Sequence, residues 1–331
     1  MNRRRLVAAF GGCSVIAATG SAIAQDRRGP RTIGFLGPPP SESGFVEAFR
    51  QGLADFGYVD GRNVRIVYRH TDVGLQGNAE RMAQLCAELI EERPEVLVVS
   101  IVEAALAAKR TTATIPIVMV SVADPVGAGL VESLARPGGN ITGMSRQGPD
   151  LIGKQLQLLR EVLPSMTRLG VLLNPNEPLR PVIEQTLRGV ASALGVQTTV
   201  LDPQAPAGLD AAFATLRRSR VDALLVTGGG AYYLSRARIA ELALANRLPT
   251  MFQGRESVEA GGLLSYAASN AASYRRAGFF VDRLLRGTPP AELPVEQPTK
   301  FELVVNLRSA AALGVTIPQP LLLRADTVLP R

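Results

Sequence analysis

Apolar and polar positions along the chain follow two different periods, which alternate in the same order twice. Short continuous apolar runs, such as residues 96–99 and 224–226, are typical of parallel strands that are covered by helices on both faces. Between such runs, apolar residues recur every three or four positions, as at Val46, Phe49 and Leu53, which predicts helices with one buried face. The pattern therefore predicts alternating strands and helices, the order of a parallel α/β sheet.

Two copies of this order are predicted at nearly constant spacing. The first consists of strands 33–36, 64–69, 96–100 and 116–120 and helices 44–56, 77–92 and 103–111. The second consists of strands 169–173, 196–201, 223–226 and 249–252 and helices 179–194, 209–219 and 234–246. Gly57 and Gly195 follow the first helix of each copy, where glycine commonly ends a helix. A repeat of this length is a duplicated domain, so we expect two similar doubly wound parallel-sheet lobes with a cleft between them.

The N-terminus has the features of an export signal. Arginines at residues 3–5 precede a mildly apolar stretch at 6–23, which ends in small residues of the kind that signal peptidase reads. We expect residues 1–24 to be removed by cleavage before Gln25, with export by the Sec or the twin-arginine route to the periplasm. A retained membrane anchor is the alternative, but glycines and serines make the stretch too polar, and no other stretch is apolar enough to span a membrane.

The composition argues against nucleic-acid binding and against disulfides. The net charge of +7 includes the arginines of the leader, and the other arginines are scattered over predicted helices and turns, which indicates a solvated surface. Of the two cysteines only Cys86 follows the leader, so no internal disulfide is expected. Its apolar neighbours indicate a small buried residue.

The sequence lacks the residues that the common catalytic and cofactor-binding motifs require. The chain has one histidine, His70, and residues 143–147 lack the second glycine of a nucleophile elbow. Residues 148–154 have the glycine spacing of a P-loop, but Gln155 stands where the magnesium-binding hydroxyl belongs. Residues 127–132 lack the third glycine of a dinucleotide fingerprint. We therefore expect no catalytic residue, no metal site and no cofactor.

The loops that follow the strands are the candidate ligand site, because ligands of open parallel sheets bind outside the carboxyl ends of the strands. These loops offer hydroxyl, amide, carboxylate and aromatic groups. Capping of helices and turns is the alternative role of Asp124, Asn174 and Asn176. Tyr232 is the stronger candidate, since a tyrosine in a glycine-rich loop is expected to have little core to fill. The candidate ligand-binding residues are Ser41, Ser43, Ser100, Asp124, Asn174, Asn176, Tyr232, Gln253 and Glu256.

Several segments also resemble one known family. They include RPGGNITG at 136–143 and PTKFELVVNL at 298–307. The others are residues 34–37, 49–53, 57–64, 115–118, 124–126 and 222–226. In order and spacing they resemble the ABC transporter substrate-binding proteins of the tryptophan/tyrosine transport type, over nearly the whole mature chain.

The resemblance implies a type I periplasmic-binding fold, in which two lobes joined by a hinge close on a small ligand. It implies hinge crossings at 143–146 and 265–268. It also implies a membrane partner, an ABC permease with its cytoplasmic ATPase. The lobes would then be 31–143 plus 268–295 for lobe one and 144–267 plus 296–331 for lobe two.

An aromatic amino acid is the leading ligand hypothesis, and another amino acid or a small carboxylate is its competitor. The chain has no tryptophan, so stacking would come from other aromatic residues. The candidates are Phe45, Tyr232, Tyr233, Phe252 and Tyr266. A ligand-sensing subunit for a membrane receptor or kinase is the first alternative function, and a secreted α/β enzyme is the second. The N-terminus has the pattern of a signal peptide and not of a helix-turn-helix, which argues strongly against a transcriptional repressor of this fold.

Overall fold

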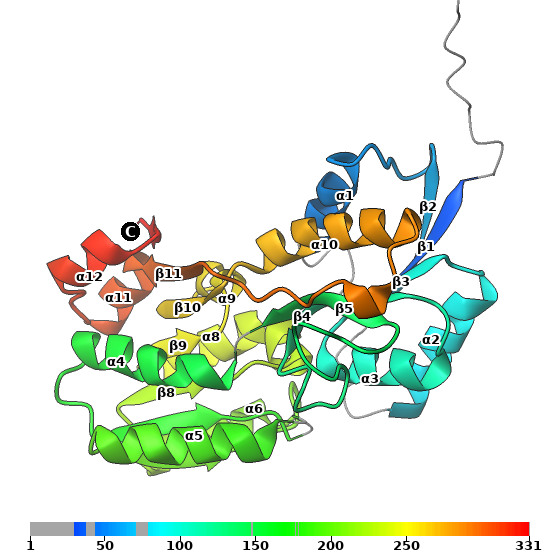
Figure 1. The fold of residues 1–331 in the computed structure, drawn as a ribbon. Helices are drawn as coiled ribbons and strands as arrows, with labels where there is room; N and C mark the ends of the chain where they lie inside the picture. The colour runs from blue at the N-terminus through cyan, green and yellow to red at the C-terminus, as the bar shows by residue number, and fades with distance from the viewer. Residues whose placement is uncertain are drawn as a thin grey trace, which may run out of the picture.

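The structure, a computed structural model, describes residues 30–37, 44–70, 79–146, 148–175, 177 and 179–330. They form two α/β lobes that lie side by side, each built on its own sheet (Figure 1). The expected leader with its cleavage point lies outside the described residues, as do the candidate ligand residues Ser41, Ser43 and Asn176.

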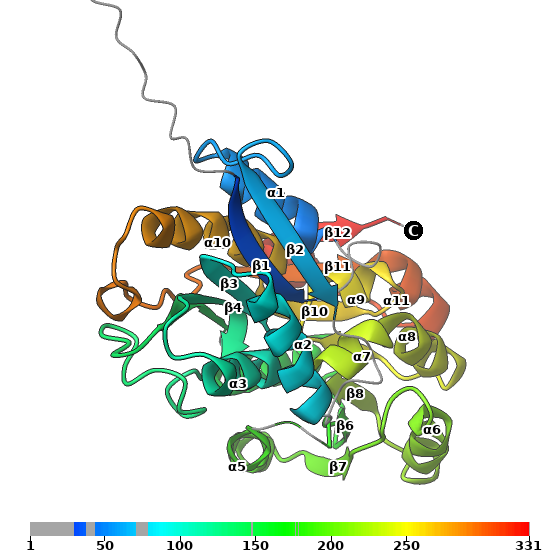
Figure 2. The ribbon, with the colours of Figure 1, turned by 90° about the vertical axis from the view of Figure 1, so that its right-hand side faces the viewer.

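The first lobe is a five-stranded sheet with helices on both faces. Its order is β2-β1-β3-β4-β5, and these neighbours pair in parallel. The strands are β1 (Arg31–Gly37), β2 (Val64–His70), β3 (Val96–Ser100), β4 (Ile117–Ala123) and β5 (Ile141–Arg146). On one face pack α1 (Phe45–Ala54) and α10 (Asn270–Leu285), and on the other α2 (Ala79–Glu91) and α3 (Val102–Thr111) (Figure 2). Because α10 comes from the C-terminal part of the chain, two separate stretches build this lobe.

The second lobe is a seven-stranded sheet in the order β12-β11-β10-β9-β8-β6-β7. Its strands are β6 (Arg168–Leu172), β7 (Gln197–Leu201), β8 (Ala223–Val226), β9 (Thr250–Phe252), β10 (Leu264–Ala268), β11 (Phe301–Asn306) and β12 (Thr327–Leu329). One face is covered by α4 (Ile152–Val162), α5 (Arg180–Ala193), α11 (Leu307–Leu313) and α12 (Gln319–Arg324). The other face is covered by α6 (Leu209–Arg218), α7 (Gly230–Leu234) and α8 (Arg236–Ala245). The short α9 (Arg255–Glu259) follows β9. The sheet is mixed, because β11 runs antiparallel to β10.

The chain passes between the lobes after β5, after β10 and again before β11. The third passage pairs with the first: Glu296 N–H donates to the Gly143 carbonyl at 2.9 Å, and Ser145 N–H donates to the Glu296 carbonyl at 2.9 Å. Gly143 has φ +127°, and a Cβ there would lie 2.2 Å from the Met119 carbonyl oxygen, so this position requires glycine. The segments expected as crossings are the strands β5 and β10, and the expected lobe boundaries stay a prediction.

The predicted elements agree with the observed ones to within about two residues at most ends. Strands β3 and β8 have the predicted bounds, and β4 extends to Ala123. Gly57 and Gly195 have φ of +83° and +66°, which confirms them as helix-ending glycines. The largest difference follows β8, where the expected loop contains the one-turn helix α7. Cys86 is a buried free thiol, as expected.

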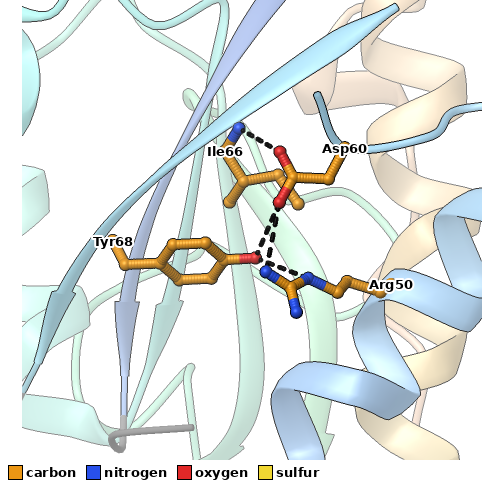
Figure 3. Close-up of polar contacts among 4 residues, drawn as sticks. All are labelled: Arg50, Asp60, Ile66 and Tyr68. Carbon is orange, nitrogen blue, oxygen red and sulfur yellow. Dashed lines mark hydrogen bonds and ion pairs between the residues drawn. The ribbon is translucent and has the colours of Figure 1, made fainter. Parts of the chain in front are cut away.

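A polar network joins α1 to the edge strand β2 (Figure 3). Arg50 donates to the Tyr68 hydroxyl at 3.1 Å and to Asp60 at 3.2 Å, and Asp60 accepts the Ile66 N–H at 3.0 Å. The network lies at the surface, and burial raises the pKa of Tyr68 to about 12. Its role is to hold the edge strand and the turn before it against α1.

Removing the Tyr68 hydroxyl should weaken this attachment. Tyr68→Phe keeps the ring in the core and deletes a hydrogen bond to a charged group, so we expect a loss of about 1 kcal/mol in the free energy of unfolding. Denaturant titration would measure the loss. An unchanged midpoint would mean that water replaces the phenol at Arg50 and Asp60.

Candidate functional site

A cleft of about 800 Å³ lies between the lobes. Lobe one contributes the ends of β3 and β4 and the first turns of α1, α3 and α10, and lobe two contributes α7 and the loop after β6. The described lining residues are Phe45, Ser100, Ile101, Val102, Glu103, Val120, Ser121, Ala123, Arg146, Glu177, Gly229, Gly230, Tyr233, Leu234, Asn270 and Tyr274. Three long helices begin here, and a helix N-terminus carries partial positive charge, so the cleft suits a ligand with an anionic group.

Aromatic rings form one wall of the cleft. Phe45 and Tyr274 stack at 4.9 Å between centroids with planes 10° apart. Tyr233 approaches Phe45 at 5.6 Å from lobe two and packs against the core of lobe one. The Arg236 guanidinium lies over the Tyr233 ring, 4.4 Å from its centre. Such a wall can stack a planar ligand ring, while Tyr233 ties the two lobes together.

Three charged side chains line the same cleft: Arg146 at the end of β5, Glu103 in the first turn of α3, and Glu177 in the loop after β6. The Arg146 Nε is buried and has no hydrogen-bond partner among the described residues. Burial lowers the pKa of Arg146, but an arginine stays charged at any physiological pH. This guanidinium is therefore placed to receive a carboxylate from a ligand.

Burial in the cleft disfavours the ionised forms of Glu103 and Glu177. Burial raises the pKa of Glu103 to about 7, and nearby Glu177 raises it as well. Burial also raises the pKa of Glu177, which Arg146 and the Leu179 N–H oppose. Leu179 N–H donates to Glu177 Oε1 at 3.4 Å. Together the charged groups offer a cation and two acids to a ligand that carries both charges.

The buried acid Glu103 should make ligand-free stability depend on pH. Its folded pKa of about 7 lies above its ordinary value of 4.5, so the folded state binds this proton more tightly than the unfolded state. Glu103 therefore contributes most to the stability of the folded state below about pH 4.5, and this contribution is lost as the pH rises through about 7. Glu103→Gln should raise the melting temperature more at pH 8 than at pH 5, which differential scanning calorimetry would measure. An equal change in melting temperature at both pH values would contradict a raised pKa of Glu103 in the folded state.

A smaller cavity of about 390 Å³ adjoins the cleft and shares Arg146, Gly229, Tyr233 and Asn270 with it. A Cβ at Gly228 would lie 2.6 Å from Arg146 Nη2 and 2.8 Å from Gln253 Oε1. The absence of a side chain at Gly228 is therefore what allows the guanidinium to lie against this loop.

The structure brings some of the sequence candidates to these cavities. Ser100 lines the cleft, where its buried Oγ interacts with the side chain of Tyr274. Gln253 lines the smaller cavity. Asn174 is buried beneath Gly229, where a Cβ would lie 3.0 Å from the Asn174 Nδ2. Their roles as ligand contacts stay predictions.

Tyr232 is placed differently from the expectation. Only 2% of it is exposed, it belongs to the core of lobe two, and its hydroxyl donates to the Pro203 carbonyl at 3.2 Å. The expectation that it has little core to fill was wrong, because the loop forms α7 and turns this side chain inward. It still borders the smaller cavity, and the cleft itself receives Tyr233.

Two acidic candidates lie away from the main cleft. Asp124 Oδ1 accepts a hydrogen bond from the Gly127 N–H at 2.9 Å. This is the turn-capping role that the sequence offered as the alternative to ligand binding. Glu256 borders a separate cavity of about 540 Å³ next to Asn270, and burial raises its pKa. Neither residue lines the main cleft.

Sequence reasoning did not select Glu103, Arg146, Glu177, Asn270 or Tyr274. Glu103 and Glu177 come within four residues after the ends of predicted strands, so a rule that kept every charged residue close behind a strand would have found them. Arg146 was assigned to a hinge crossing, and Tyr274 lies one turn inside a helix. No local pattern marks either of these two as facing a cleft.

The described residues contain no group of three or more His, Cys, Asp or Glu side chains placed to hold a metal ion. Within the same residues, no helix is long and apolar enough to cross a membrane.

Residues 39–329 match the family model of the ABC transporter substrate binding protein. The chain belongs to this family. The resemblance carried by the sequence segments is thereby confirmed. A tyrosine-binding protein from Clostridioides difficile (strain R20291) is 26% identical over 292 residues, which are 88% of this chain and 83% of that protein.

Solved structures of similar proteins confirm the two-lobed periplasmic-binding fold. The ABC domain from Streptococcus pneumoniae in complex with L-Trp superposes with a TM-score of 0.82 at 25% identity, over 91% of this chain and 100% of that one. A conserved domain protein from Vibrio cholerae superposes with a TM-score of 0.81 at 27% identity, over 90% of this chain and 99% of that one.

Proposed function

We propose that this substrate-binding protein binds an aromatic L-amino acid in the cleft between its lobes. The observation that carries the proposal is that a stacked aromatic pair, a buried guanidinium and two carboxylates line one and the same cavity. An aromatic amino acid presents the matching groups, a ring, a carboxylate and an ammonium. The relatives named for tyrosine and bound to L-Trp support the same ligand class.

The binding mode follows from these groups. The ligand carboxylate pairs with Arg146, which has a buried donor to spare, and the ammonium pairs with the carboxylate of Glu177. The ring lies along Phe45 and Tyr274. Phe45 and Tyr233 are already in contact at 5.6 Å, so the ring packs beside this pair and not between its members.

Closure of the lobes follows from contacts on both sides. Glu177 and Tyr233 belong to lobe two, whereas Phe45 and Tyr274 belong to lobe one. A ligand that touches all four favours the closed arrangement over the open one. We propose that the exported, periplasmic protein presents this closed form to an ABC permease with its ATPase and releases the ligand chemically unchanged.

Titration calorimetry tests the ligand class. Purified protein would be titrated with L-tyrosine, L-tryptophan and L-phenylalanine, and with L-leucine, L-glutamate and benzoate as comparisons. We expect heat only from ligands that combine an aromatic ring with an α-amino acid group. Binding restricted to the comparison ligands would overturn the proposal.

The aromatic wall can be tested with one substitution. Tyr274→Leu keeps an apolar side chain but loses the stacked ring, so we expect about tenfold weaker binding of the aromatic amino acid. Tyr266→Leu is the matched control, because Tyr266 pairs with Phe301 and borders none of the three cavities described above. Equal effects of the two substitutions would argue against stacking on Tyr274.

A further inference from the structure

Glu103 is the charge in the cleft that the proposed binding mode leaves without a partner. Among the described lining residues the charged ones are Glu103, Arg146 and Glu177. Arg146 and Glu177 balance each other, and an amino acid ligand adds one charge of each sign. An ionised Glu103 would therefore leave one uncompensated negative charge in a closed cleft, where an unpaired charge is costly.

Among the residues that the structure describes, the other elements around Glu103 supply no further cation to the cleft. Strands β3 and β4 carry no charged residue. From α10 the cleft receives Tyr274, whose pKa burial raises, and from α7 it receives Tyr233. On α2, which packs against α3, Arg81 forms an ion pair with Glu88, and Arg69 of β2 pairs with the same carboxylate. Arg146 is thus the cation that the described cleft offers, and two carboxylates share it.

We propose that Glu103 couples the ligand's net charge to a proton. The cleft binds a zwitterionic aromatic amino acid together with a proton on Glu103, and it binds the corresponding aromatic amine with Glu103 ionised. The inference rests on the proposed function, since it concerns the same cleft. It adds a specificity residue and a second ligand class, the aromatic monoamines.

The physical reason is charge balance in both complexes. With the zwitterion bound, the site is neutral only when Glu103 is protonated, and the neutral carboxyl can then donate a hydrogen bond. With the amine bound, the extra positive charge compensates an ionised Glu103. Because the pKa of Glu103 is about 7, the free protein is a mixture of both forms at neutral pH, so each ligand moves the proton in its own direction.

The decisive experiment compares L-tyrosine with tyramine by titration calorimetry at pH 7, in phosphate, HEPES and Tris buffers. The slope of binding enthalpy against buffer ionisation enthalpy gives the number of protons exchanged. We expect proton uptake with L-tyrosine and proton release with tyramine. Slopes of the same sign, or slopes of zero, would overturn the inference, whereas heat from neither ligand would count against the proposed function itself.

A pH series and two variants complete the test. Between pH 7 and 8.5 the Kd of L-tyrosine should rise by up to about tenfold per pH unit, whereas that of tyramine should fall slightly or stay level. Glu103→Gln should abolish the pH dependence of Kd for both ligands, and it should weaken the binding of tyramine more than that of L-tyrosine. Glu91→Gln, on the exposed surface of α2, is the control and should behave as the wild type. If Glu103→Gln does not fold, the two wild-type slopes still decide the question.

Discussion

Replacing Arg146 with glutamine is expected to weaken binding of the aromatic amino acid by about 100-fold or more. The guanidinium lines the cleft and has a buried Nε with no hydrogen-bond partner among the described residues. Losing one member of a buried charged pair costs roughly 2–5 kcal/mol, which is about 30-fold to several-thousand-fold in affinity. The loss adds to the cost of leaving Glu103 and Glu177 beside each other without a cation.

Calorimetric titration of Arg146→Gln and Arg146→Lys would measure this effect. Lysine keeps the charge but not the planar fork, so we expect it to recover only part of the affinity. Arg188→Gln is the matched control, since this arginine on α5 is 70% exposed. Wild-type affinity in Arg146→Gln would mean that the ligand carboxylate binds elsewhere, with the N-termini of α1, α3 and α10 as the next candidates.

The strands and helices could be predicted because their signal is local. A continuous apolar run or a three-to-four period depends only on neighbouring residues, and both lobes follow that rule. The mixed sheet of lobe two could not be derived from such runs. Strand β11 is antiparallel because the chain first leaves lobe two to lay α10 on lobe one, and that detour is a property of the whole fold.

The candidate site was only partly predictable, and the tyrosine pair in α7 shows why. Tyr232 and Tyr233 are adjacent in a glycine-rich segment, and reading it as a loop gives no reason to choose between them. In a helix, neighbouring side chains point about 100° apart, so one ring enters the core of lobe two and the other crosses to Phe45. The prediction chose Tyr232 because it treated the segment as a loop and did not include the single turn of α7.

The residues that were missed share a second property, which is that their partners are distant in the chain. Tyr274 gains its place in the cleft by stacking on Phe45, and Arg146 meets Glu103 and Glu177 only when both lobes are present. The rule that ligands bind at the carboxyl ends of parallel strands finds Ser100 and Gln253, because it depends only on a residue's position within one sheet. It cannot find groups that become neighbours through the packing of α10 on α1.

Gly278→Ala should be among the most destabilising single-methyl changes in the chain. Gly278 on α10 faces Gly52 on α1, and a Cβ on Gly278 would lie 2.2 Å from the Gly52 carbonyl carbon and 2.7 Å from the Leu53 nitrogen. The atoms it meets are backbone, so no side-chain rotation relieves the clash and the helices must separate. We expect a loss of about 3 kcal/mol in the free energy of unfolding. Denaturant titration measures it.

Gly189→Ala provides a control with the opposite sign. Gly189 lies inside α5, where a Cβ would meet nothing within 4 Å, so the same substitution should stabilise the protein by up to about 1 kcal/mol through helix propensity. Because α1 and α10 carry Phe45 and Tyr274, forcing these helices apart should also weaken aromatic ligand binding, whereas Gly189→Ala should leave binding unchanged. A stable Gly278→Ala variant with full affinity would show that the close α1–α10 contact is not what holds the aromatic wall in place.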